Sequence, residues 1–376
     1  MREFDYSKLK ERIWDNEIMA YVAQIHEFKG KQDLFLRQKP VGLNRLVEIA
    51  KLQSTESSNQ IEGIITTNSR LKQLVENKTT PRNRDEQEIL GYRNALNIIH
   101  ESYEAIPVRS SYILQLHGEL LKHTAFSYGG KYKTTPNEID MVLENGEKIV
   151  LLKPLEPYET PSAVERLCEE YNKAFGEGIV DPLILIPNFI LDFLCIHPFN
   201  DGNGRMSRLL TLLLLFRAGY IVGQYISIEK AIADTKETYY EVLQQADREW
   251  HSGENDPKPF IKYMLGIILS CYREFESRVS LAAKTGKKSS AYDIVKSFTE
   301  NTLGKFSKQD ALFSCPSLGS SSVESALKKL VEEGAIYSTC ISTDFSVLFL
   351  LLKYMLISGI LKVEDYKFKE DTTHQA

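Results

Sequence analysis

The segment from His197 to Arg208 holds the residue types that phosphate chemistry requires, and it reads His-Pro-Phe-Asn-Asp-Gly-Asn-Gly-Arg-Met-Ser-Arg. Pro198 disfavours helical geometry at the residue before it, so a helix should end at His197 and leave the imidazole on a loop. Gly202 and Gly204 permit positive φ angles, which turn successive backbone N–H groups toward one point. A helix expected directly afterwards adds free amides and a positive dipole end. These features predict an anion cradle sized for a di- or triphosphate.

Charged side chains complete the predicted site. Arg205 and Arg208 are three residues apart, so they share the helical face that borders the loop. Asp201 supplies an oxygen ligand for a phosphate-bound Mg²⁺, an ion that takes one or two carboxylates beside phosphates and waters. His197 can accept the proton of an alcohol, which is a poor nucleophile at its own pKa. A lone Gly-x-Gly is usually a turn and a lone histidine at a helix end usually satisfies a carbonyl, but this combination favours nucleotide chemistry.

The same segment resembles the Fic (filamentation induced by cAMP) motif HPFx(D/E)GNGRxxR, which it matches at every specified position. The resemblance extends over residues 30–275. It implies a mainly α fold, with a Fic helical core and a β-hairpin flap. It also implies a protein adenylyltransferase that moves AMP from ATP to a Ser, Thr or Tyr hydroxyl of a target protein. Modification of the chain itself and a homodimer are left open.

The resemblance gives a role to each matching position. His197 would be the general base, Asp201 the Mg²⁺ ligand and Phe199 the side chain that packs beneath the loop. The residues expected to bind the phosphates of ATP are Gly202, Asn203, Gly204, Arg205 and Arg208. Tyr239 and Tyr240 resemble a family element near the adenine, with a pair of core tyrosines as the alternative.

Upstream, Ser58-Asn-Gln-Ile-Glu62-Gly63 resembles the family's inhibitory pattern (S/T)xxxE(G/N). Ser58 and Glu62 are four residues apart, so both point from one face of the last helical turn. Gly63 ends that helix and leaves Glu62 projecting from its tip. A carboxylate there can form a bidentate pair with an arginine. The resemblance implies that the partner is Arg208, whose capture would prevent productive binding of the γ-phosphate. A solvated helix end is the alternative.

Most of residues 1–280 has helical periodicity. One helix should end at Gly63, and the others are expected over residues 85–103, 110–123, 161–175, 182–196, 205–219, 231–250 and 259–281. The exception is a hairpin, whose strands 139–143 and 148–152 flank Glu-Asn-Gly-Glu. Asn-Gly suits both positive-φ positions of a type I′ turn. By the resemblance, residues 139–152 form a flap that pairs with an extended segment of the target protein.

The C-terminal region begins after a polar, basic linker at residues 284–290. Short helices are expected over 291–298, 307–313 and 321–333, the last with a capping box of Ser321 and Glu324. Residues 291–340 resemble a winged helix-turn-helix. DNA binding through them is left open and is not favoured, because such folds also serve in protein contacts.

The usual polar wing is replaced by an apolar run over residues 345–361. It is short for a membrane span, so a helix packed on the domain or on a second copy is the preferred interpretation. Membrane insertion, and a lost or altered wing, are the alternatives.

Composition sets the remaining expectations. The 376 residues carry a net charge of −5, which gives the whole molecule no electrostatic reason to coat nucleic acid. Five scattered cysteines fit a reducing cytosol, and the first residues lack the apolar core of a signal peptide, so we expect a cytoplasmic protein. The expected divisions are an N-terminal helical region (1–108), a catalytic core (109–282), a winged-helix-like domain (291–340) and a tail (341–376).

Three other functions remain open. The site could remove AMP, with Glu62 positioning a water molecule. It could also use another nucleotide as donor. The third is a nucleotide-responsive regulator that binds DNA.

Overall fold

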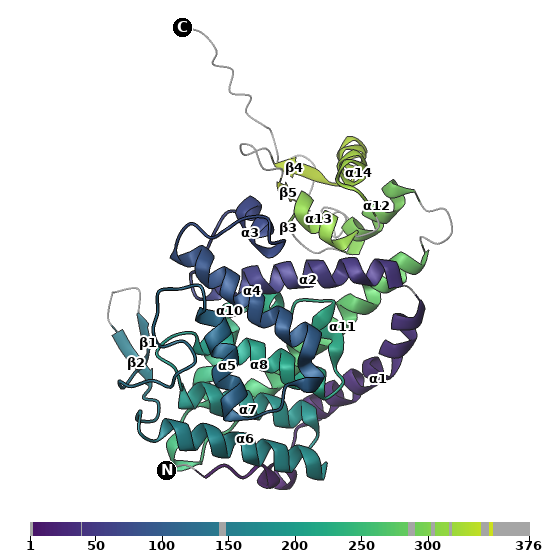
Figure 1. Cartoon of the computed structure of the whole chain (residues 1–376). Helices are drawn as coiled ribbons and strands as arrows, with labels where there is room; N and C mark the ends of the chain where they lie inside the picture. The colour runs from purple at the N-terminus through teal and green to yellow at the C-terminus, as the bar shows by residue number, and fades with distance from the viewer. Residues whose placement is uncertain are drawn as a thin grey trace. The chain divides into compact units, whose positions relative to one another are not determined.

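The computed structural model of the chain describes residues 3–38, 40–142, 148–284, 290–301, 305–315, 318–339 and 346–348. Internal contacts divide the chain into two units, Met1–Ser277 and Arg278–Ala376. The described residues are mainly helical, as predicted (Figure 1). None of the described helices is long and apolar enough to cross a membrane.

The first unit is a layered set of α-helices joined by short turns. Its longer helices are α1 (Asn16–Gln38), α2 (Pro40–Ile61), α3 (Asn68–Val75), α4 (Arg84–Ser102), α5 (Ser110–Leu121), α6 (Thr160–Glu177), α7 (Pro182–Ile196), α8 (Asn203–Arg217), α9 (Ile228–Asp234), α10 (Lys236–Ala246) and α11 (Lys258–Lys284). The described residues of this unit also contain 3₁₀ turns. One, η1 (Tyr6–Glu11), precedes α1, and the others lie between helices: η2 (Tyr103–Ala105), η3 (Ile221–Gln224) and η4 (Trp250–Ser252).

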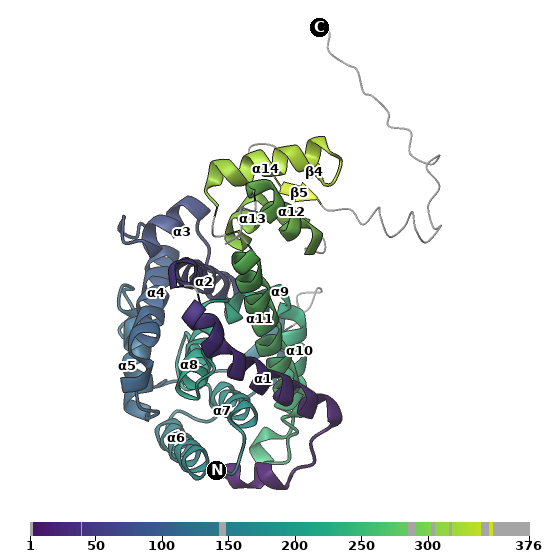
Figure 2. The same ribbon diagram turned by 90° about the vertical axis from the view of Figure 1, so that its right-hand side faces the viewer.

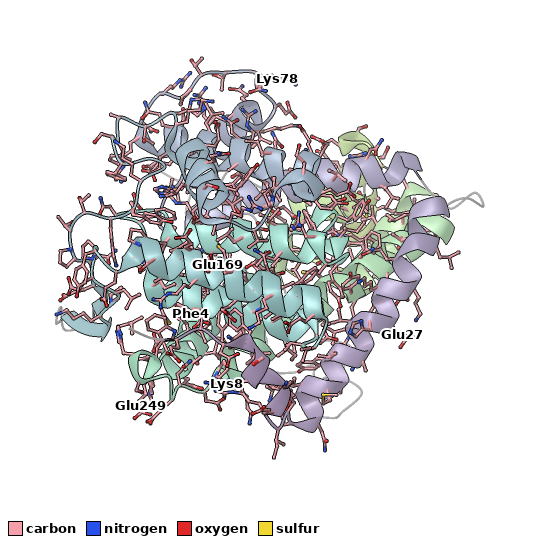
Figure 3. The ribbon with its side chains drawn as sticks, turned by 60° about the horizontal axis from the view of Figure 1, so that its bottom comes forward. Phe4, Lys8, Glu27, Lys78, Glu169 and Glu249 are labelled. Atoms are coloured by element: carbon pink, nitrogen blue, oxygen red, sulfur yellow. The ribbon has the colours of Figure 1, made fainter. Side chains whose placement is uncertain are left out.

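Helix α8 lies in the centre of this unit, with α2 and α7 on opposite sides of it (Figures 1 and 2). The reason is its sequence, because residues 209–216 read Leu-Leu-Thr-Leu-Leu-Leu-Leu-Phe and every one of them is buried. A helix that is apolar all round is stable only when other helices surround it. Charged side chains instead project from the outer helices and loops, as Lys78, Glu169 and Glu249 do in Figure 3. The start of α8, which carries the predicted phosphate site, is thereby held on a rigid core.

Most helices begin and end within three residues of their predicted bounds. The single helix predicted over residues 231–250 is wrong, because the chain breaks between α9 and α10 at Thr235. The Thr235 hydroxyl donates to the Ala231 carbonyl at 2.9 Å and lies 2.7 Å from the Tyr263 hydroxyl. A hydroxyl so close to its own backbone competes with the helical hydrogen bonds.

The predicted hairpin is present as β1 (Ile139–Val142) and β2 (Lys148–Leu152). The strands are antiparallel, with Met141 opposite Ile149 and Val142 opposite Lys148. They lie at the periphery of the helical body (Figure 1). The predicted Asn-Gly turn falls outside the described residues.

The second unit has the helix, strand, helix, helix and hairpin order that the winged-helix resemblance implied. Its described elements are α12 (Ala291–Asn301), β3 (Lys305–Ser307), α13 (Lys308–Ser314), α14 (Ser320–Glu332), β4 (Tyr337–Thr339) and β5 (Ser346–Leu348), with the strands in the order β3-β5-β4. Val295, Phe306, Val323 and Leu330 lie in its core.

Two expectations for this unit are wrong. Residues 346–348 form a strand that pairs with both neighbours, whereas a helix was expected over 345–361. Residues 349–361 lie outside the described part of the chain. The capping box is formed by Ser307 and Asp310 before α13, and α14 starts at Ser320 without a side-chain cap. Asp310 is one methylene shorter than the glutamate of the usual pattern, but its carboxylate still accepts from the Ser307 N–H at 2.7 Å.

Candidate active site

The loop after α7 begins where Pro198 predicts the helix to end. Helix α7 ends at Ile196, and the next residue, His197, caps it with φ +50° and ψ 61°. Phe199 is completely buried and its ring stacks on His117 with the ring centroids 3.7 Å apart. His117 accepts from the Gly130 N–H, and its other ring nitrogen lies 3.0 Å from the Asp201 carbonyl. This buried histidine therefore supports the loop, in agreement with a structural role.

Asn203, the first residue of α8, closes the loop with its side chain. Its Oδ1 accepts from the Phe199 N–H at 2.9 Å and its Nδ2 donates to the Phe199 carbonyl at 2.8 Å. Both ends of the side-chain amide are thus engaged with the loop. A phosphate would therefore meet the backbone N–H of Asn203, at the helix start, and not its side chain.

The two glycines serve different purposes. Gly202 has φ +83° and its N–H donates to Asp201 Oδ1 at 2.6 Å. The positive φ expected for Gly204 is wrong, because this residue is already in the first turn of α8. Space above Gly204 is nevertheless limited. A Cβ atom on Gly204 would overlap the Glu62 carboxylate and lie 3.3 Å from Arg208 Nη1.

Glu62 and Ser58 reach Arg208 from the end of α2. Arg208 Nη2 donates to Glu62 Oε1 at 2.7 Å. The same guanidinium donates from Nε to the Ser58 hydroxyl at 2.8 Å and from Nη2 to the Ser58 carbonyl at 2.8 Å. The pair is a single contact and not the bidentate one expected, because Ser58 takes the Nε side of the guanidinium fork.

This contact is shielded from water on the side of Arg208 and is partly exposed on the side of Glu62. The Arg208 side chain is 3% exposed and that of Glu62 is 33% exposed. Burial alone would raise the pKa of Glu62, but the Arg208 guanidinium outweighs it and holds the pKa below its usual value. Glu62 is therefore a carboxylate at neutral pH. It lies where the predicted cradle would receive an anion.

Arg205 is held by a residue that the sequence analysis missed. Its Nη1 donates to Glu88 Oε2 at 2.6 Å, and both side chains are 1% exposed. Its Nη2 donates to Asp201 Oδ1 at 3.3 Å. Its Nε has no hydrogen-bond partner among the described residues. Glu88 also accepts from Arg84 Nε at 2.7 Å. A fully buried acid is tolerated because it is paired.

A second group that the sequence analysis missed surrounds His197. Asn137 Nδ2 lies 2.9 Å from His197 Nδ1. Lys133 Nζ donates to Asn137 Oδ1 at 2.7 Å and to the Ile196 carbonyl at 3.2 Å. Burial, together with the charge of Lys133, lowers the pKa of His197 to about 4. The imidazole is therefore neutral at physiological pH, which is the form that a base requires.

Tyr239 and Tyr240 lie on α10, which contacts the C-terminal end of α2. Tyr239 is buried, and its ring centroid lies 5.4 Å from that of the half-exposed Tyr240. Burial raises the pKa of both hydroxyls, and the charges of Glu62 and Arg208 act on them to a smaller extent. Lys236, one turn earlier on α10, donates to the Ile61 carbonyl at 2.7 Å and so caps the last turn of α2.

Asp201 is the one candidate here for a metal ligand. Its side chain is 36% exposed, with Oδ1 bound by the Gly202 N–H and Arg205, and Oδ2 3.8 Å from Arg84 Nη2. Among the described residues no cluster of three His, Cys, Asp or Glu side chains forms a metal cage. A lone accessible carboxylate beside a phosphate cradle fits Mg²⁺, which is bound by one or two carboxylates together with phosphates and waters.

Comparison with known proteins identifies this arrangement. Residues 107–215 match the model of the Fic/DOC family. These residues are therefore similar to a Fic domain. Two curated relatives named protein adenylyltransferase Fic match a larger part of the chain. The protein of Nematostella vectensis is 27% identical over 241 residues, which cover 59% of this chain and 48% of that protein. The Drosophila melanogaster protein is 28% identical over 247 residues, covering 65% and 43%. The chain thus spans less than half the length of these relatives.

Solved structures agree with the Fic assignment. A Fic domain containing signaling protein from Bacteroides thetaiotaomicron has a TM-score of 0.58 and 26% identity, covering 70% of this chain and 97% of that one. Fic-1 from C. elegans, at a TM-score of 0.56 and 19% identity, shares the fold over 72% of this chain and 74% of its own. The resemblance drawn from the motif is confirmed.

Proposed function

We propose that the Fic domain of this chain transfers AMP from ATP to a hydroxyl group of a target protein. The proposal depends on one observation, that His197, Asp201 and Arg208 all lie near the N-terminal end of α8. The curated relatives of this domain are named protein adenylyltransferases. A histidine base, a carboxylate and an arginine at a helix N-terminus form the set that phosphoryl transfer needs.

The chain's own groups would divide the reaction as follows. The hydroxyl oxygen of the target attacks the α-phosphorus of ATP, the bond to the β-phosphate oxygen breaks, and pyrophosphate leaves. His197 takes the proton of the attacking hydroxyl. The N–H groups of Asn203 and Gly204 and the positive end of α8 would bind the phosphates, with Arg208 on the γ-phosphate. Asp201 would hold Mg²⁺, which supplies neutralising charge at the phosphate oxygens.

Arg205 would contribute to the cradle in a different way from Arg208. Its two terminal nitrogens already donate to Glu88 and Asp201, so fewer of its five N–H groups are left for a phosphate. We therefore propose that Arg205 mainly orients Asp201 and adds positive charge beneath the phosphates. Arg205 would therefore take a smaller part in direct phosphate binding than the sequence analysis expected.

Glu62 would restrain this reaction. Its carboxylate occupies the space over Gly204 and bonds the one arginine proposed for the γ-phosphate. ATP would then bind with its γ-phosphate displaced, and the α-phosphorus would not lie in line with the hydroxyl. The β1–β2 hairpin is proposed to take an extended segment of the target as an added strand.

Replacement of the base tests the proposal most directly. With ATP labelled on its α-phosphate, a Glu62→Gly protein should label itself or a supplied protein. The additional substitution His197→Ala should lower this by about 10²–10⁴-fold, because the base is lost while the cradle is not. Binding of ATP should be kept. Equal labelling with and without His197 would remove the histidine from the mechanism.

Removal of AMP from a protein remains a second candidate because of one contact. The ionised Glu62 carboxylate lies at the phosphate-binding end of α8, where it could position a water molecule for attack on the α-phosphorus. Release of AMP from a modified protein by the wild type but not by Glu62→Gly would favour this function.

A further inference from the structure

The hydrogen bonds around Asn137 fix which way its side-chain amide points. Its Nδ2 lies 3.0 Å from the Phe199 carbonyl and 3.4 Å from the His197 carbonyl, and both of these groups only accept. Its Oδ1 lies 2.7 Å from Lys133 Nζ, which only donates. A flipped amide would place oxygen against the carbonyls and an NH₂ group against the ammonium. The orientation is therefore set by the network.

This orientation decides where His197 carries its proton. One hydrogen of Asn137 Nδ2 goes to the Phe199 carbonyl, and the other points at His197 Nδ1, 2.9 Å away. A nitrogen that receives an N–H bond has its lone pair engaged and holds no proton. A neutral imidazole carries one N–H, so the proton must be on Nε2. No described residue bonds Nε2.

We propose that Asn137 is a positioning residue that sets the tautomer of His197, and that it keeps the base unable to accept a proton until Nδ1 is released. With the proton on Nε2, the only lone pair of the ring is the one that Asn137 occupies. When the hydrogen bond from Asn137 to Nδ1 breaks, the proton can pass from Nε2 to Nδ1 through solvent without any change in ring charge. Nε2 then becomes the acceptor for the hydroxyl proton. The consequence for catalysis rests on the proposed function, whereas the tautomer does not.

We call the hydrogen bond from Asn137 to His197 Nδ1 the lock. It lies close to β1, where the proposed target segment would bind. Asn137 lies two residues before the first residue of β1. Lys133 is tied to the loop by its own N–H, which donates to the Pro198 carbonyl at 2.9 Å. Lys133 is buried and pushes the pKa of His197 down, while Glu62 and Asp201 act in the opposite direction. These are the charged groups that influence the ring. The lock acts because Asn137 donates to Nδ1 and so decides which ring nitrogen carries the proton. It does not depend on the Glu62–Arg208 contact.

The test reads the tautomer by nitrogen NMR on protein labelled in its histidines, with the His197 signals assigned from a His197→Ala sample. The wild type should show a protonated Nε2 and an unprotonated Nδ1. Asn137→Asp replaces the donor by a carboxylate, which accepts from Nδ1–H, so the two assignments should exchange. Asn137→Ala should give a mixture of both tautomers. Asn172→Ala, which removes a similar side-chain bond to the Val108 carbonyl far from the ring, is the matched control and should resemble the wild type.

A wild-type proton on Nδ1, or the same tautomer in all four proteins, would overturn the proposal. If Asn137→Asp fails to fold, the tautomers of His197 in Asn137→Ala decide: a mixture supports the proposal, and the wild-type tautomer alone overturns it. Transfer is then measured in the Glu62→Gly background, where adding Asn137→Ala should raise it by about 2–10-fold, the effect of losing one ordinary hydrogen bond. A fall would refute the locking role. Absence of transfer in every variant would count against the proposed function and would leave the NMR result standing.

Discussion

The contact between Glu62 and Arg208 yields the most direct prediction. Replacing Glu62 by Gly removes one charge-assisted hydrogen bond of 2.7 Å from a site where the arginine is 3% exposed. Such a bond is worth about 1.5–3 kcal/mol. Since about 1.4 kcal/mol corresponds to a factor of ten, transfer of AMP should rise by about 10–100-fold. The gain should appear in transfer more than in ATP affinity, because the phosphate amides of α8 are unchanged.

The assay is incorporation of α-labelled AMP into the protein itself and into a supplied target. Two companion variants sharpen it. Glu62→Gln removes the charge but still fills the space over Gly204, so its gain should be smaller than that of Glu62→Gly. Arg208→Ala should cancel the gain, because the brake and the transfer use the same guanidinium, and the two substitutions should be strongly non-additive. Unchanged or lower labelling in Glu62→Gly would refute the brake.

Three further outcomes are expected. Asp201→Asn should depress transfer and raise the Mg²⁺ concentration needed for half-maximal rate, because an amide is a poorer ligand than a carboxylate; an unchanged metal titration would exclude Asp201. Val142→Pro in β1 should impair modification of a target while ATP binding, measured by calorimetry, stays the same; equal loss of ATP binding would place the hairpin in the nucleotide pocket. Glu86 accepts from Arg70 and from the Arg82 N–H, and these bonds lower its pKa to about 2. Its contribution to stability is therefore complete above about pH 4.5 and is lost as the pH falls toward 2. Thermal melts should show this acid loss in the wild type and less of it in Glu86→Gln.

Local spacing allowed much of the site to be predicted. Pro198 fixed the end of α7, and the four-residue spacing of Ser58 and Glu62 placed both on one face, where both now contact Arg208. These features depend on residues near one another in the chain, so sequence periodicity reports them.

The residues that were missed act across long stretches of chain. Glu88 bonds Arg205 over a separation of 117 residues and Asn137 bonds His197 over 60. In the sequence, Glu88 lies four residues after Arg84, and an Arg and a Glu at this spacing usually form an ion pair on the helix surface. Only the packing of α4 on α8 makes it a buried partner. The strand at residues 346–348 was missed for another reason, since a short apolar run does not distinguish a strand from a buried helix.

The end of α2 is held by contacts that do not involve Glu62. The Ser54 hydroxyl donates to Glu229 Oε2 at 2.7 Å, and Glu229 is itself buried and accepts from the Tyr92 hydroxyl at 3.0 Å. Lys236 bonds the Ile61 carbonyl, and Glu62 lies just after the last helical residue. Removing the Glu62 carboxylate therefore leaves the helix in place and adds no cavity to the core. A change in transfer caused by that substitution can be attributed to the carboxylate and not to a displaced helix.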